Sequence, residues 1–127
     1  MANMLPSIVI DGCIFAFDAA NTRSYLGTGI NVNGLVGGIG GTLINGVGFT
    51  SSNNGSFIFD GSNDYLDFGY NSSINNATQF TIECWYKSAN IGVEGILFNT
   101  NSYGVTTPAY GYHLEIYQRK LFSCSKE

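Results

Sequence analysis

The sequence predicts an all-β sandwich or barrel, and three observations lead to this fold class. Apolar residues either alternate with polar residues or form short runs, and both patterns are typical of strands. Glycine and asparagine interrupt these patterns at short intervals, as turns between strands require. No window repeats apolar residues at helical spacing over three turns, and the 17 glycines disfavour helices further.

The strand patterns follow one another along most of the chain. They cover Ser7–Ile10, Cys13–Phe17, Thr42–Ile44, Ser56–Phe59, Tyr65–Phe68, Phe80–Lys87, Gly95–Phe98, Tyr110–Tyr117 and Lys120–Ser125. Residues 27–55 carry most of the glycines and no charged residue, which predicts long loops around one or two short strands. Between 71 and 78, the sequence NSSINNAT leaves room for one helical turn at most.

The segment FTIECWYK, residues 80–87, has the longest regular alternation. One face of the predicted strand is apolar and consists of Phe80, Ile82, Cys84 and Tyr86. The other face consists of Thr81, Glu83, Trp85 and Lys87. We expect the first face to contact the core. Because Trp85 is large and apolar, we expect a second layer or a partner to cover part of the other face.

The composition limits the function classes. With 127 residues, the chain suits a single domain over 1–127. Its net charge is −4 and its basic residues cluster only at Arg119-Lys120, which argues against nucleic acid as a partner. No apolar run approaches the roughly 20 residues of a membrane helix, so no membrane insertion is predicted. The first residues lack the basic stretch of a secretory signal, so we expect any extracellular role to follow release as part of a particle.

Zinc and nucleotide sites are not predicted. Cys13, Cys84 and Cys124 stand singly in apolar stretches, and we interpret them as small buried residues. The single histidine, His113, lies in an alternating strand pattern without a second candidate zinc ligand. The glycine-rich stretch contains neither of the common phosphate-binding patterns and precedes no predicted helix.

Four stretches, taken in order, resemble a known family. They are DGCIFAFDAANTRSYLGTG (11–29), GGTLINGVGFTSSNNGSFIFDGSNDYLDFG (40–69), FTIECWYK (80–87) and YGYHLEIYQRKLFSCS (110–125). This series resembles the laminin-G-like, concanavalin-A-like lectin and glucanase jelly rolls, particularly the copies in bacteriophage tail fibres and other virion proteins. The resemblance implies an antiparallel two-sheet jelly-roll sandwich, with FDGSNDYL (59–66) as a hairpin between two core strands and 80–87 as a long central strand.

The resemblance covers only the leading part of the usual domain, which continues beyond the position of Ser125. A sandwich that is incomplete at its C-terminus leaves unpaired sheet edges and exposed apolar surface. The missing strands could come from a partner, the chain could be a fragment, or it could be a shortened member of the family. Each alternative favours contact between chains, so we expect a homo-oligomer or a strand-sharing partner.

Catalysis is not predicted. Retaining glucanases of this fold class use paired carboxylates in an E-x-D-x-x-E strand. Here Glu83 and Glu115 each stand alone, and His113 beside Glu115 is better explained as a polar pair. No nucleophile-elbow pattern is present. We therefore expect the chain not to be an enzyme.

Calcium is the only metal for which the sequence offers candidate ligands. Asp60 and Asp64 lie in the DGSND cluster, and the jelly-roll topology could bring Asp18 close to them. The resemblance permits such a site, because related domains bind calcium at a sheet rim. The same cluster is also a good turn, since Asp-Gly favours chain reversal and Asn and Asp bond to nearby backbone. Both interpretations stay open at this point.

The function that we expect is a non-enzymatic virion structural protein, a tail-fibre, adhesin or capsid decoration module that contacts other virion proteins. Cell-surface glycans are further candidate partners, with stacking and hydrogen-bonding residues at Tyr70, Tyr103, Tyr110, Tyr112, Asn71, Asn99 and Asn101. The alternative is a secreted carbohydrate-binding lectin module, and calcium dependence of that module is left open. A glycan-cleaving enzyme is the third and least supported class.

Overall fold

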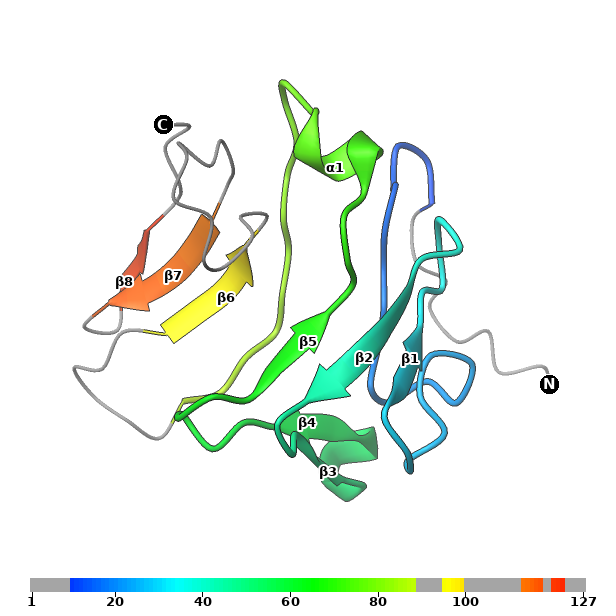
Figure 1. The fold of residues 1–127 in the computed structure, drawn as a ribbon, viewed down its shortest axis with the longest axis vertical. Coiled ribbons are helices and arrows are strands. Elements are labelled where there is room, and N and C mark those ends of the chain that lie inside the picture. Colours follow the sequence, from blue (N-terminus) through cyan, green and yellow to red (C-terminus); the bar gives the residue numbers. More distant parts are fainter. Residues whose placement is uncertain (1–9, 89–94, 100–112, 118–119, 123–127) are drawn as a thin grey trace, which may run out of the picture. The chain divides into compact units, whose positions relative to one another are not determined.

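The structure is a computed structural model that describes residues 10–88, 95–99, 113–117 and 120–122. The chain divides into two compact units, Met1–Gly69 and Tyr70–Glu127. Figure 1 labels the strands and helices of both units, which are described separately below. The single domain expected over 1–127 stays a prediction.

The first unit contains a three-stranded antiparallel sheet. Its strands are β1 (Asn31–Asn33), β2 (Gly40–Ile44) and β5 (Tyr65–Asp67), in the order β1-β2-β5. Val32 and Leu43 are buried with 1% and 6% of their surfaces exposed, and Leu43 lies opposite Leu66. This face of the sheet therefore supplies the core, and the alternate positions form the face toward solvent.

A second, two-stranded sheet consists of β3 (Gly48–Thr50) and β4 (Ser56–Ile58). A 3-10 turn, η1 (Ser52–Asn54), joins the two strands. Asn53 and Asn54 have φ angles of 54° and 72°, a left-handed backbone that asparagine tolerates better than most residues. The tip of the β-hairpin therefore lies at η1, between β3 and β4.

The connections between the two sheets correct one prediction. FDGSNDYL was expected to be a hairpin between paired strands, but β4 pairs with β3 and β5 pairs with β2. Residues 59–64 instead carry the chain from one sheet to the other. The stretch from β2 to β3 runs beside the stretch from β4 to β5. Asn45 and Gly46, at φ angles of 64° and 102°, interrupt the first stretch where residues 59–64 interrupt the second. The Asn45 side-chain amide donates to the Asn63 carbonyl at 2.8 Å and ties the two interruptions together.

The core of the first unit is aromatic. Tyr25 is buried, and its ring centroid lies 5.2 Å from that of Phe49 and 5.0 Å from that of Phe57. Phe68 continues the cluster, with its ring centroid 4.7 Å from Phe15 and 5.0 Å from Phe17. Such tilted and edge-on ring pairs add to the stabilisation that burial of their area provides.

The segment that precedes β1 is held by turns and by one isolated bridge. The strand predicted over Cys13–Phe17 is wrong, because only Ala16 pairs, with Val36. Ser24 is fully buried, donates from its hydroxyl to the Asn33 carbonyl at 2.6 Å and accepts from the Asp18 amide at 3.1 Å. Residues 7–9 of the first predicted strand lie outside the described residues, and Ile10 is not in a strand.

The second unit begins with a single helical turn, α1 (Ser72–Asn75), which agrees with the sequence prediction for 71–78. The Asn71 side chain caps it by accepting from the Ser73 amide at 3.0 Å. A three-stranded antiparallel sheet follows. It consists of β6 (Gly95–Asn99), β7 (His113–Tyr117) and β8 (Lys120–Phe122), in that order.

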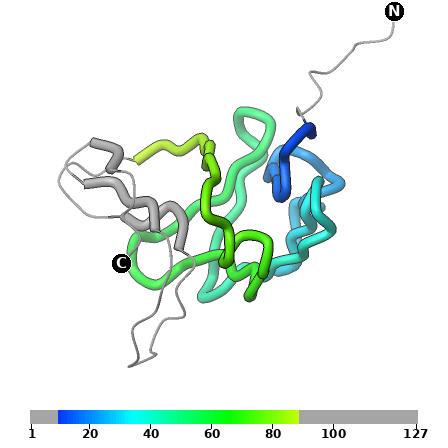
Figure 2. The backbone as a smooth tube through the Cα atoms, turned by 90° about the horizontal axis from the view of Figure 1, so that it is seen from above, coloured from blue at the N-terminus to red at the C-terminus, as the bar shows by residue number. Residues whose placement is uncertain are grey.

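The long strand predicted over 80–87 is the clearest error. None of these residues belongs to a strand in the described part of the chain, and all of them are exposed except Ile82, which is half-buried. Trp85 is 104% exposed. The segment forms the light green end of the coloured backbone in Figure 2. Alternation indicates that a segment can lie in a sheet, but it does not supply the neighbouring strand that must bond to it.

The coarse fold class is confirmed. The described residues are mostly antiparallel strands and turns with little helix. The strands predicted within 42–44, 56–59, 65–68, 95–98, 113–117 and 120–122 form, although 110–112 and 123–125 lie outside the description. One or two short strands were predicted within 27–55, and three form there; the positions of β1 and β3 were not predicted, because the glycine-rich stretch gives them almost no apolar pattern. No helix among the described residues has the length and apolar character needed to cross a membrane.

Candidate functional site

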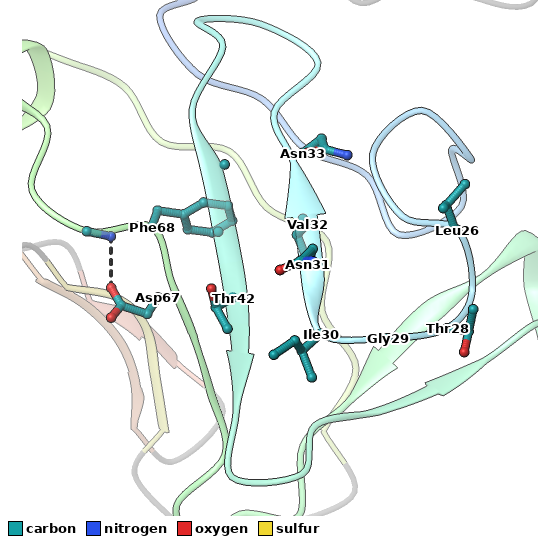
Figure 3. A pocket seen from close by; sticks show the side chains of 13 residues that line it. Leu26, Thr28, Gly29, Ile30, Asn31, Val32, Asn33, Thr42, Asp67 and Phe68 are labelled. Atoms are coloured by element: carbon teal, nitrogen blue, oxygen red, sulfur yellow. Dashed lines mark hydrogen bonds between the residues drawn. The ribbon is translucent and has the colours of Figure 1, made fainter.

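A shallow hollow of about 750 Å³ lies on the first unit, over β1 and β2 (Figure 3). Three polar residues on adjacent strands line it in one row. Thr42 in the middle strand has Asn31 opposite it on one side and Asp67 on the other. The row therefore offers a carboxamide, a hydroxyl and a carboxylate across the width of the sheet.

The neighbouring positions keep the hollow open. Gly40 lies opposite Asn33, and its missing side chain leaves the space beside Thr42 free. The Asp67 carboxylate is oriented by the Gly69 amide, which donates to Oδ1 at 2.8 Å, drawn as the dashed line in Figure 3. Leu26, which also lines the hollow, is 77% exposed. Polar groups beside an apolar surface can bind a polyhydroxylated ligand, because such ligands present both hydroxyls and C–H faces.

This row was not predicted from the sequence. NVN, residues 31–33, alternates in the required way, but three residues are too few to stand out beside the glycines. The signal that joins Asn31, Thr42 and Asp67 is the strand register, which is not a local property of the sequence.

In the structure, the acidic residues proposed as calcium ligands make hydrogen bonds within their own turns. The Asp60 carboxylate accepts from the Ser62 amide at 2.8 Å, and Asp64 Oδ2 accepts from the Asp60 amide at 3.0 Å. Gly61 takes a φ angle of 79°, so the turn chemistry expected of Asp-Gly is present. Asp18 is engaged in its own turn, where Oδ1 accepts from the Ala20 amide at 2.9 Å.

One oxygen of this acidic turn is without a partner. Asp64 Oδ1 is buried and makes no hydrogen bond among the described residues, and a Cβ at Gly46 would lie 4.0 Å from it. A buried carboxylate oxygen of this kind is a suitable cation ligand. However, no group of three or more His, Cys, Asp or Glu side chains within the described ranges could hold a metal ion. Calcium binding by Asp60, Asp64 and Asp18 stays a prediction.

The candidate sugar-binding residues are only partly described. Tyr70 is 73% exposed, and its hydroxyl donates to the Asn76 side chain at 3.4 Å. Asn71 is the cap of α1. Asn99 ends β6, whereas Tyr103, Tyr110, Tyr112 and Asn101 lie outside the described residues.

The residues weighed for catalysis do not form a described site. Glu83 is exposed in the segment after α1, and His113 and Glu115 both lie in β7. Among the cysteines, Cys13 is half-buried, whereas Cys84 is exposed and its predicted burial is wrong. Cys124 lies outside the described residues.

Exposed apolar side chains are the second candidate for a functional surface. Monomeric proteins bury most large apolar side chains, yet Trp85 and Tyr86 lie in solvent in the second unit. We call residues 81–87 the open segment, since this stretch is extended in Figure 1 and belongs to no strand among the described residues. In the first unit, Ile30, Ile58 and Tyr65 are each at least half exposed.

The polar row and the open segment are the two features on which the proposals below are based. They differ in chemistry, because the row offers hydrogen-bonding side chains, whereas the open segment offers exposed apolar side chains on a stretch that belongs to no described strand. Comparisons of the chain with protein-family models, with curated proteins and with solved structures find no match.

Proposed function

We propose that the chain is a non-enzymatic structural module of a bacteriophage particle, in a tail fibre, an adhesin or a capsid decoration, and that it acts by contacting other virion subunits. The observation that carries this proposal is the exposure of the open segment, with Trp85 fully in solvent. Fully burying one large apolar side chain stabilises a protein by about 1.5–3 kcal/mol. A neighbouring subunit that covers this segment would provide that stabilisation.

Two further observations support the proposal. Only three hydrophobic residues, Tyr25, Val32 and Leu43, are buried among the described residues, so the described part of the chain has a small core. The sequence resembles virion copies of the laminin-G-like jelly roll, and its neutral Asn, Ser, Thr and Gly content suits a particle surface. We extend the proposal to the finer architecture, a concanavalin-A-like two-sheet jelly roll that is completed when a further strand joins the open segment.

Particle composition tests this role. Phage particles are purified from cultures that carry the gene and are analysed by mass spectrometry, with immunogold labelling to locate the chain. The expected result is a fixed number of copies per particle at one position. A chain that remains in the soluble fraction and is absent from purified particles would contradict the proposal.

Glycan binding is the second candidate function, and the polar row of Asn31, Thr42 and Asp67 favours it. A glycan array compares the wild type with D67A and with D11A, which removes an exposed acid outside the hollow. The expected result is retention of specific glycans by the wild type and D11A and loss by D67A. Loss of binding on chelation would add calcium dependence, and an array without any retained glycan would remove this candidate.

A further inference from the structure

The open segment has the properties of an unpaired edge strand. It is extended, it alternates between apolar and polar residues, and it pairs with no strand of the described chain. Cys84, Trp85 and Tyr86 are exposed along it. An extended backbone with unpaired N–H and C=O groups is a template for an added strand from another chain.

The sequence of the segment is complementary to itself. Two identical antiparallel strands are related by a two-fold axis that runs midway between them, and the axis is said to pass through a residue when that residue lies opposite its own copy. When the axis passes through Trp85, Glu83 of each copy lies opposite Lys87 of the other copy. Both ends of the pair then hold opposite charges, with the two indole rings between them on the same face.

The other registers lack this match. An axis through Glu83 places two carboxylates opposite each other, and an axis through Cys84 places Glu83 opposite Trp85. A parallel, in-register pair places Glu83 beside Glu83 and Lys87 beside Lys87 of the other copy. Like charges directly opposite each other destabilise a strand pair, whereas opposite charges and aromatic pairs stabilise it. Charge complementarity thus favours one partner, a second copy of this chain, in one register.

We infer that two copies of the chain associate through their open segments, as an antiparallel strand pair centred on Trp85. The inference rests on the proposed role of this segment as a subunit contact, and it names the first neighbour as a second copy. Trp85 is the only tryptophan of the chain, so its fluorescence reports on this contact alone.

The test measures self-association of the whole 127-residue chain by light scattering and by Trp85 emission over a range of concentrations. The wild type is expected to form dimers, with emission moving to shorter wavelength as Trp85 leaves water. E83K places like charges opposite each other at both ends, and K87E does the same with the opposite sign. Each variant is expected to weaken dimerisation about tenfold, given two altered cross-strand pairs.

Mixing the two variants provides the decisive arm. In a one-to-one mixture of E83K and K87E, every charge again faces its opposite, so a heterodimer as tight as the wild-type dimer is expected. The recovery also shows that both variants are folded. D11K makes the same charge change as E83K at an exposed acid outside the segment, and it is expected to leave the dimer unchanged.

Two outcomes would overturn the inference: a wild type that stays monomeric at all concentrations, or a mixture that associates no better than either variant alone. Either result in a chain that is nevertheless found in purified particles would leave the proposed function standing, with a different protein as neighbour. Dimerisation of a chain that is absent from particles would support the strand pair and contradict the proposed function.

Discussion

The replacement G41A tests the packing of the three-stranded sheet most sharply. Gly41 lies in β2, and a Cβ there would come 2.5 Å from Phe68 Cδ1 and 2.6 Å from Cε1, with the Asp67 carbonyl oxygen at 3.1 Å. The Phe68 ring cannot move away freely, because it packs against the rings of Phe15 and Phe17. The added methyl group must therefore displace the aromatic cluster.

The size of the effect follows from two opposing contributions. Overpacking a core costs about 1–3 kcal/mol. Replacing glycine with alanine also restricts the unfolded chain, which stabilises the folded state by about 0.4–1 kcal/mol. We expect a net loss of about 1–2 kcal/mol for G41A. With a urea dependence of about 1.5 kcal/mol/M, this loss lowers the unfolding midpoint by roughly 1 M.

G40A is the matched control, because Gly40 precedes Gly41 in the same strand. The nearest atom to its added Cβ is the Val32 carbonyl oxygen at 3.7 Å, an ordinary contact. We expect G40A to be at least as stable as the wild type. Urea unfolding is followed by far-ultraviolet circular dichroism, since Trp85, the only tryptophan, lies in the second unit. Equal midpoints for G41A and G40A would refute the packing of Phe68 on β2.

Three further variants and one control test the core and the turns, each by the same urea unfolding. V32A removes two methyl groups from the most buried apolar side chain and is expected to cost about 2 kcal/mol, whereas L26A, at an exposed position, should cost almost nothing. A loss for L26A as large as that for V32A would contradict the assignment of the core. S24A leaves the Asn33 carbonyl and the Asp18 amide without their partner and is expected to cost about 1–3 kcal/mol; no loss would mean that water replaces the hydroxyl. D64A removes the acceptor of the Asp60 amide and should cost about 1 kcal/mol, and an unchanged midpoint would show that the turn does not need this bond.

Local patterns predicted the strands whose apolar residues point into the core. Leu43 in β2 and Leu66 in β5 alternate with more polar residues, so their strands follow from the sequence. β1 and β3 do not, since their neighbours are mostly glycines. Gly41 in β2 shows why a strand can contain glycine in place of an apolar residue. Its missing side chain makes room for Phe68, which lies far along the chain. A requirement set by a distant residue leaves no periodic signal.

Turn chemistry was easier to predict than strand pairing. Asp60 and Gly61 form the turn that the Asp-Gly pair predicts. The expected hairpin was nevertheless wrong, because Asn45 and Gly46 interrupt the opposite arm and both arms change sheets together. Which strand pairs with which depends on contacts between segments, so the sequence around a turn does not determine it.

The candidate sites also differ in how far the local sequence predicts them. The sequence identified the acids of the 60–64 turn, and the structure adds the buried Asp64 Oδ1 but not a third acidic ligand within the described residues. The polar row depends on the register of three strands, so Asn31 and Thr42 could not be singled out beforehand. For 80–87, the alternation was recognised correctly, but the partner strand that it requires is not among the described strands of the chain.

Hydrogen exchange of the open segment tests the central claim most directly, since the claim is that other subunits cover residues 81–87. Amide exchange is measured by mass spectrometry on the dilute, isolated chain and on the chain within purified particles. We expect fast exchange across the segment in the isolated chain and strong protection in the particle, because added strands bond to these amides. Equal, fast exchange in both states would contradict it.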